Sequence, residues 1–196
     1  MLNKWIKLLL VPAVALSLSA CGINSVPTAE ENAKAKWADV ESSYQRRADL
    51  IPNLVETVKG FATQEQDTLT AVVEARAKAT SIQVNANDLG DAAKVQEYAA
   101  AQGALSQGLG RLLATVEAYP ELKSNQNFLA LQSQLEGTEN RINVARRDYN
   151  EAVREYNTTI RTFPDIIGAK IIHGAEPMEP FKATTPGADE APEVKF

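Results

Sequence analysis

The sequence predicts an all-α fold, an antiparallel up-and-down bundle of long helices, from three observations. Alanine and the good helix formers glutamate, glutamine, arginine and lysine are abundant between residues 29 and 163. Glycine and proline cluster outside the periodic stretches of that region. Apolar residues recur there at alternating spacings of three and four, which is typical of helices packed near-parallel over several turns.

The first 20 residues have the features of a signal peptide. Lys4 and Lys7 form a positive n-region, and residues 8–18 form an apolar run. A helix needs about 20 apolar residues to cross a bilayer, so this run is short for a permanent span and suits an h-region. The run ends in the letters LSAC at 18–21, which resemble a lipobox. This predicts cleavage after residue 20 and lipidation of Cys21; the alternative is a buried cysteine after an ordinary signal peptide.

Acyl chains on Cys21 would attach the mature protein to a lipid bilayer. Each buried CH₂ contributes about 0.8 kcal/mol, so two or three chains give stable anchoring. Gly22 follows the cysteine where an aspartate would indicate retention, which by resemblance to Gram-negative lipoprotein sorting favours the outer membrane over the inner one. Residues 21–28 are then a lipidated tether, and the expected location is the cell envelope, facing the periplasm.

A first helix is expected over residues 29–48. Thr28 is a good N-cap, and Glu31 stands at the capping-box spacing from it. Asp49 is a suitable cap for a second helix over residues 49–82.

The alternative is a single helix continuing through a kink at Pro52, because the apolar register is unbroken from Ala33 to Ile82. Helix lengths favour the fold-back at Asp49. A continuous first helix would project past its neighbours and leave Trp37 and nearby apolar side chains uncovered, which costs several kcal/mol at about 25 cal/mol per Å².

Two further long helices follow a turn at residues 85–88. The third is expected over residues 89–118, and Ser124 is the expected cap of the fourth. The fourth carries the most regular apolar stripe of the chain: Phe128, Leu131, Leu135, Ile142, Ala145, Tyr149, Ala152, Tyr156 and Phe163. A small apolar segment with Ile166, Ile167, Ile171 and Ile172 comes after Pro164. Residues 29–182 thus form the expected bundle, and residues 183–196 a disordered tail rich in proline and glutamate.

Charge and composition exclude several classes of function. The formal charge is -5, and removing Lys4 and Lys7 with the signal peptide makes it -7, which argues against nucleic-acid binding. His173 is the only histidine, whereas a metal site in a bundle needs Glu-x-x-His pairs. Cys21 is consumed by lipid, and the chain has no glycine-rich phosphate loop. We therefore predict no enzymatic activity, no cofactor and no metal.

Two groups of polar residues are candidates for a structural or binding role beyond that of ordinary solvent-exposed side chains. Arg46, Arg47 and Asp49 beside Pro52 either tie the second helix to its neighbours or contact a partner protein.

The second group interrupts the apolar stripes, and counting back from the turns places its members at one height: Glu65, Thr68, Gln102 and Thr138. This predicts a polar core layer in which Glu65 bonds Gln102, at a cost in stability but with a gain in register. The alternative is that Glu65 faces water and Leu69 takes its core position.

Several motifs resemble the LemA family, in the family's order. They are RRADLIPNLVETVKGF at 46–61, EAR at 74–76, AYPELK at 118–123, ENRI at 139–142, ARRDYN at 145–150 and TFP at 162–164. The resemblance covers about residues 37–181 and implies a helical envelope domain, anchored at its N-terminus, with no agreed biochemical activity. The chain departs from many relatives in having a lipobox where they resemble proteins with a spanning helix.

These observations together predict a lipid-anchored, non-enzymatic scaffold or adaptor that presents helical surface to another envelope protein. The alternative is a bundle that binds a small ligand or acts as an enzyme through buried carboxylates. Glycines on the third helix, Gly103, Gly108 and Gly110, either line such a pocket or allow close helix approach.

Overall fold

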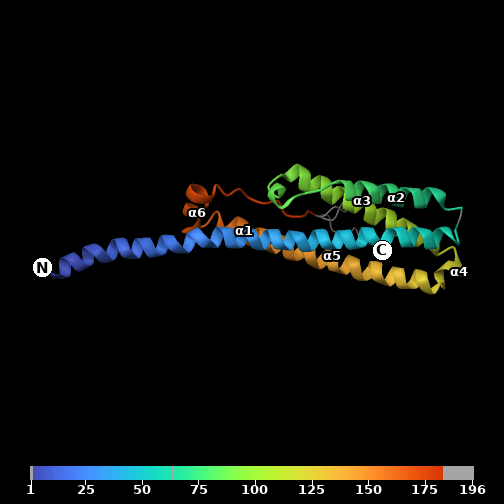
Figure 1. Cartoon of the computed structure of the whole chain (residues 1–196), viewed down its shortest axis with the longest axis horizontal. Coiled ribbons are helices and arrows are strands. Elements are labelled where there is room, and N and C mark those ends of the chain that lie inside the picture. Colours follow the sequence, from blue (N-terminus) through green and yellow to red (C-terminus); the bar gives the residue numbers. More distant parts are fainter. Residues whose placement is uncertain (1, 63, 183–196) are drawn as a thin grey trace, which may run out of the picture.

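The chain is all-α, as predicted, in the residues that the structure describes. The structure is a computed structural model; it describes residues 2–62 and 64–182, with side chains from residue 23 onward. No strand occurs in this part of the chain (Figure 1). Its elements are α1 (Leu2–Lys59), α2 (Gln66–Ser81), the short η1 (Ala86–Asp88), α3 (Ala92–Val116), α4 (Pro120–Lys123), α5 (Gln126–Thr159), α6 (Asp165–Gly168) and the π-helical η2 (Ala169–His173).

Helix α1 is one uninterrupted helix, so the preferred fold-back at Asp49 is wrong and the continuous alternative is correct. Its N-terminal part projects beyond the other elements, and the rest runs along them (Figure 1). Thr28 is inside α1 and donates a hydrogen bond to the Asn24 carbonyl instead of capping a helix. Asp49 is exposed in mid-helix and accepts a hydrogen bond from Gln45.

Helix α1 contains three prolines, Pro12, Pro27 and Pro52, and for the last two the structure shows which side chain bonds the freed carbonyl. Proline has no N–H, so it leaves the carbonyl four residues earlier without its helical partner. Pro52 frees the Ala48 carbonyl in this way, and Arg76 of α2 donates to it from Nε at 2.7 Å. Pro27 likewise frees the Ile23 carbonyl, which accepts from His173 Nε2 of η2 at 3.0 Å.

The chain reverses direction at residues 60–65 instead of at Asp49. The second helix is therefore the shorter α2, beginning at Gln66. Asp91 caps α3 by accepting from the backbone N–H groups of Ala93 and Lys94. Asn125, and not Ser124, caps α5, because its side-chain oxygen accepts from the first turn of that helix.

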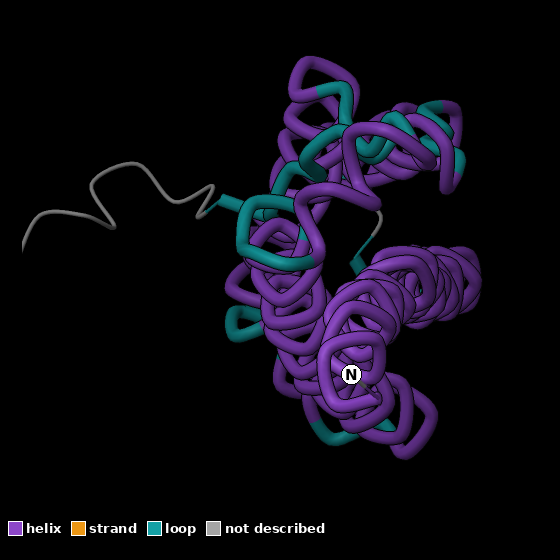
Figure 2. The backbone as a smooth tube through the Cα atoms, turned by 90° about the vertical axis from the view of Figure 1, so that its left-hand side faces the viewer, coloured by secondary structure: helices purple, strands orange, loops and turns teal. Residues whose placement is uncertain are grey.

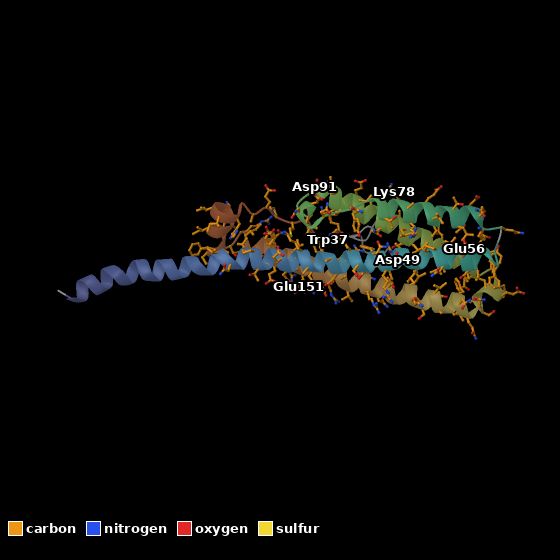
Figure 3. All side chains as sticks on the ribbon, viewed as in Figure 1. Trp37, Asp49, Glu56, Lys78, Asp91 and Glu151 are labelled. Carbon is orange, nitrogen blue, oxygen red and sulfur yellow. The ribbon has the colours of Figure 1, made fainter. Side chains whose placement is uncertain are left out.

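The four longer helices lie side by side as two pairs (Figures 1 and 2). Helix α1 packs mainly on α5, and α2 packs mainly on α3. Side chains fill the space between them in two hydrophobic cores (Figure 3). The distal core, near the 60–65 turn, is largely aliphatic and includes Ile51, Leu54, Val58, Leu69, Val72, Leu105, Leu109, Leu112, Val116, Leu122, Phe128 and Leu135.

The proximal core, toward the N-terminal end, is rich in aromatic rings. It includes Trp37, Val40, Tyr44, Tyr98, Ile142, Tyr149, Val153, Tyr156, Met178 and Phe181. Trp37 is 1% exposed and donates from Nε1 to the Val84 carbonyl at 3.0 Å. The continuous α1 therefore does not leave Trp37, Val40 or Tyr44 uncovered, because α5 and residues beyond η2 extend along it.

The last described residues, 175–182, form an extended segment that we call the C-terminal strap. Asn157 bonds both backbone groups of Met178, and Asn150 bonds both backbone groups of Phe181, at 2.8–3.0 Å. Phe181 stacks on Trp37 with ring centroids 5.4 Å apart. The strap thus supplies core side chains that the sequence interpretation assigned only to helices.

One predicted core position is wrong: Phe163 follows the end of α5 and is 79% exposed. Phe61 at the 60–65 turn is also largely accessible, at 42% exposure. The predicted tail at 183–196 lies outside the described residues. Cys21 lies outside the residues whose side chains are described, and its lipidation stays a prediction. None of the helices in the described part of the chain combines the length and apolarity needed to cross a bilayer.

Candidate functional site: a buried arginine layer and a helix groove

A polar layer separates the two cores. Within the described chain, the buried polar residues are Arg47 on α1, Gln102 on α3 and Thr138 on α5. Each stands between a proximal-core and a distal-core residue of its own helix, for example between Tyr44 and Ile51 in α1. The layer therefore joins three helices at one level of the structure.

Arg47 is the centre of this layer, at 1% exposure. Its Nη1 donates to Ser106 Oγ at 2.6 Å and to Glu139 Oε2 at 3.2 Å. Its Nη2 donates to the Gln102 carbonyl at 3.1 Å and to Gln102 Oε1 at 2.8 Å. The guanidinium also lies 5.0 Å from the centroid of the Tyr44 ring.

A buried cation of this kind is stable only when its donors are matched and its charge is balanced. Glu139 supplies the opposite charge and remains about half exposed, so its own desolvation is modest. Among the five N–H donors, Nε is buried without a hydrogen-bond partner. Burial raises the pKa of the neighbouring Tyr98 and Tyr44 hydroxyls, so both tyrosines are neutral at physiological pH.

The predicted layer of Glu65, Thr68, Gln102 and Thr138, in which Glu65 bonds Gln102, is not formed, because Glu65 and Gln102 lie at opposite ends of α2. Gln102 and Thr138 are buried in the observed layer. Glu65 directly precedes α2 and accepts a hydrogen bond from the Tyr119 hydroxyl at 2.8 Å. Gln102 instead bonds the Ala79 carbonyl at the other end of α2. The 14 residues between positions 65 and 79 span about 21 Å of helix. Thr68 is half-buried in the first turns of α2, near Glu65 and away from the layer.

The sequence predicted that Arg46, Arg47 and Asp49 together either tie a helix to its neighbours or contact a partner protein, and the structure separates the three residues. Arg47 points inward and is inaccessible, whereas Arg46 and Asp49 are exposed. Arg46 lies beside Arg141 and Asp148 of α5 along a shallow depression between α1 and α5. The sequence offered one indication of this layer: Arg47 stands at a position where the helical spacing of the apolar residues of α1 predicts a buried side chain.

A groove runs between α3 and α5, and Arg47 forms part of its floor. Three cavities of about 290, 320 and 450 Å³ follow one another along it. The middle cavity is lined by Leu109, Gly110 and Leu113 of α3 and by Leu135, Glu136 and Glu139 of α5. A Cβ built on Gly110 meets no atom within 4 Å, so the space above this glycine is open. Gly108, by contrast, lies against Val72 of α2.

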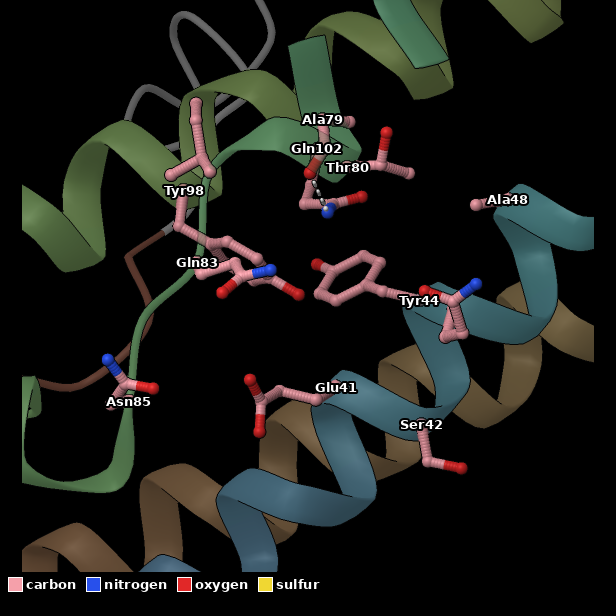
Figure 4. A pocket seen from close by; sticks show the side chains of 12 residues that line it. Glu41, Ser42, Tyr44, Ala48, Ala79, Thr80, Gln83, Asn85, Tyr98 and Gln102 are labelled. Atoms are coloured by element: carbon pink, nitrogen blue, oxygen red, sulfur yellow. Dashed lines mark hydrogen bonds between the residues drawn. The ribbon is translucent and has the colours of Figure 1, made fainter. Parts of the chain in front are cut away.

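A separate cavity of about 360 Å³ opens on the other side of Tyr44 (Figure 4). Tyr44 and Glu41 reach it from α1, Tyr98 from α3, and Gln83 and Asn85 from the loop before η1. Burial raises the pKa of the Glu41 carboxyl. The cavity combines aromatic faces with amide and carboxyl groups, which suits a small polar molecule.

The groups expected for metal chemistry are not gathered in the described residues. No three histidine, cysteine, aspartate or glutamate side chains lie together there as possible ligands. His173 is exposed and holds the Ile23 carbonyl, so its observed contact is structural.

Comparison with known proteins identifies the family. A LemA family profile matches residues 36–196. The magnetosome proteins MamQ 2 and MamQ 1 of Paramagnetospirillum magneticum are each 28% identical over 145 residues, covering 66% of this chain and 53% of the relative. Magnetosome protein MamQ of Magnetospirillum gryphiswaldense is 27% identical over 145 residues, covering 65% and 53%.

The chain thus spans about half the length of the curated relatives it matches. The family match extends over most of the sequence and includes the arginine layer, both sides of the α3–α5 groove and the C-terminal strap. The chain belongs to the LemA family.

Proposed function

We propose that this membrane-associated envelope protein is a lipid-anchored, non-enzymatic adaptor that holds an amphipathic helix of another envelope protein in the α3–α5 groove. The main observation that supports this proposal is the groove between α3 and α5. Family membership and similarity to magnetosome proteins support the coarser description, a membrane-associated envelope protein.

The shape and lining of the groove suit a helix better than a small molecule. Leucines on both sides offer apolar contacts along successive turns, and two glycines of α3, Gly103 and Gly110, line it without side chains. Helix-in-groove recognition uses apolar anchors at i, i+3, i+4 and i+7 of the incoming helix.

Charge defines the partner further. Glu136 and Glu139 line the middle cavity together with one cation, Arg47, which is already bonded to Glu139. The cavities on either side add Arg146 at one end and Lys123, paired with Glu117, at the other. The part of the incoming helix that lies over the middle cavity should therefore carry a lysine or arginine beside its apolar face.

Site-specific photocrosslinking in intact cells tests the groove. Benzoylphenylalanine replaces Gln107, an exposed groove residue, or Ala77, an exposed residue of α2. We expect one discrete adduct with an envelope protein from position 107 and none from position 77. A Gly110→Trp change should abolish that adduct, because it fills open space in the groove. Gly137→Trp, which also enters open space but lies outside the groove, should leave it unchanged.

Several outcomes would contradict the proposal. They are an adduct twice the mass of the chain, an adduct within the chain, or a partner that persists with Gly110→Trp. The first would indicate a second copy of this chain in the groove, and the second would indicate that the chain fills the groove itself.

The lipid anchor has its own test. Cys21→Ser removes the thiol that accepts the diacylglyceryl group, so the variant should stay unprocessed in the inner membrane. Mass spectrometry of the N-terminal peptide of the wild type should show an acylated Cys21. Soluble mature protein of normal size from the variant would overturn the anchor.

A second candidate function rests on the cavity beside Tyr44 and Glu41. A carboxyl group with a raised pKa and two buried tyrosines around about 360 Å³ could bind a small polar ligand. Native mass spectrometry of protein extracted from membranes distinguishes the two: a bound metabolite that Glu41→Gln releases favours this function, and an unliganded mass favours the adaptor.

A further inference from the structure

One end of the molecule concentrates exposed apolar side chains. The described side chains include nine large apolar residues that are exposed, and five of them lie around the start of the helical body: Ile23, Phe163, Ile167, Ile171 and Ile172. Ile171 and Phe163 are 78% and 79% exposed. We call these five residues the end patch. Large apolar residues gathered on one surface are typical of an interaction site.

The end patch is held in a defined place on α1. Ile23 belongs to α1, and the other four residues come from α6, η2 and the segment before them, which pack against α1 where it leaves the other helices (Figure 1). Asp165 bonds the Ser25 hydroxyl, and His173 bonds the carbonyl that Pro27 leaves free. The patch is therefore positioned by the fold, beside the first residues of the predicted mature chain.

We propose that the end patch inserts into the surface of the lipid bilayer, so that the protein stands on the membrane at a set orientation. This inference rests on the membrane attachment in the proposed function. Ile23 is two residues from Cys21. If the signal peptide instead stays in place, the apolar run that ends at residue 18 lies within about 8 Å of Ile23 along the helix. Either form of attachment brings the patch to the membrane.

The composition of the segment favours a bilayer over a protein partner. Between residues 161 and 173, Arg161 and Lys170 are cations, and the single carboxylate, Asp165, is bonded to Ser25. Isoleucine and phenylalanine flanked by cations suit the boundary between acyl chains and anionic headgroups. The predicted mature chain has a net negative charge, which argues against a general attraction to anionic lipid, so contact with the bilayer depends on these local cations and apolar side chains.

Quenching measurements test the insertion on the full chain reconstituted in vesicles of phosphatidylethanolamine and phosphatidylglycerol. A fluorophore is attached to Ile171→Cys or, as a matched control, to Phe61→Cys, an exposed apolar residue at the opposite end. A lipid-borne quencher should lower the emission of the label at position 171 by about half or more, and that at position 61 hardly at all. Equal access of aqueous iodide to both positions would overturn the proposal.

A second variant separates insertion from attachment. Phe163→Ser, Ile171→Ser and Ile172→Ser together should abolish lipid quenching of a label at Ile167→Cys while the protein stays on the vesicles. The three side chains are exposed, so the fold should not depend on them. Unchanged quenching in this variant would contradict a role for the patch.

The failure of this inference is distinguishable from failure of the proposed function. An acylated Cys21 takes up no label in the wild type, so labelling there contradicts the lipid anchor alone. In that case the same quenching comparison is made in a Cys21→Ser background. Photocrosslinking from position 107 tests the groove independently of the membrane measurements.

Discussion

The proximal and distal halves of the molecule solve the same packing problem differently. In the distal half, aliphatic side chains of four helices fill the core at regular spacings. In the proximal half, α2 has ended, and five aromatic rings, Trp37, Tyr44, Tyr98, Tyr149 and Phe181, fill the wider space with centroids 5.2–6.4 Å apart. An extended strap completes that core where a helix is missing, and asparagine side chains provide the hydrogen bonds that a neighbouring strand would offer.

This comparison predicts that Phe181 is essential to the proximal half. Phe181→Ala should lower the free energy of unfolding by about 4 kcal/mol, as large-to-small changes in a core do. Phe61→Ala, a matched change at an exposed phenylalanine of the distal half, should cost less than about 0.5 kcal/mol. Denaturant unfolding followed by circular dichroism measures both. Equal midpoints for the two variants would remove the strap from the core.

Alkaline pH should weaken the proximal half first. Burial raises the pKa of Tyr98 and Tyr149 above the ordinary value of 10, so their folded forms bind protons that the unfolded chain loses. Their contribution is complete below pH 10 and is lost as pH rises further, by about 1.4 kcal/mol per pH unit for each tyrosine. Hydrogen exchange at pH 10–11 should show proximal amides exposed before those of Leu105 and Leu112 in the distal core, once corrected for intrinsic exchange. Simultaneous exposure of both cores would contradict this.

The asparagine contacts of the strap should have a smaller effect. Asn150→Ala removes two hydrogen bonds to the backbone of Phe181 and should cost about 2 kcal/mol. Asn140→Ala, at an exposed asparagine of the same helix, is the control. Limited proteolysis should cut the Asn150 variant within the strap much faster than the control. Protection equal to wild type would mean that the rings alone hold the strap.

The sequence predicted the helical class and most core positions because apolar periodicity reports directly on helix faces. It placed Tyr149 and Leu135 in the core correctly, since both are buried on α5. It misplaced the first break because Asp49 and Pro52 resemble a helix start. The carbonyl freed by Pro52 is satisfied by Arg76, 24 residues later, and no local signal reveals such a partner.

The candidate site was less predictable for a related physical reason. Arg47 stands in a charged run, where arginine is usually exposed, and its burial depends on Gln102, Ser106 and Glu139 from two distant helices. The strap contains only short apolar interruptions among prolines and glutamates, so periodicity could not indicate Met178 or Phe181 as core residues. Asn150 and Asn157, seven residues apart on one helical face, were the available signal.

Arg47 and Gln102 form one layer that joins the two cores and fixes the floor of the groove. A double-mutant cycle with Arg47→Met and Gln102→Leu, measured by denaturant unfolding, tests it most directly. Each single change leaves the other buried polar side chain without its hydrogen bond, and the double change removes both side chains of the pair. The two costs should therefore fall short of additivity by at least about 1 kcal/mol. Strictly additive costs would contradict the layer.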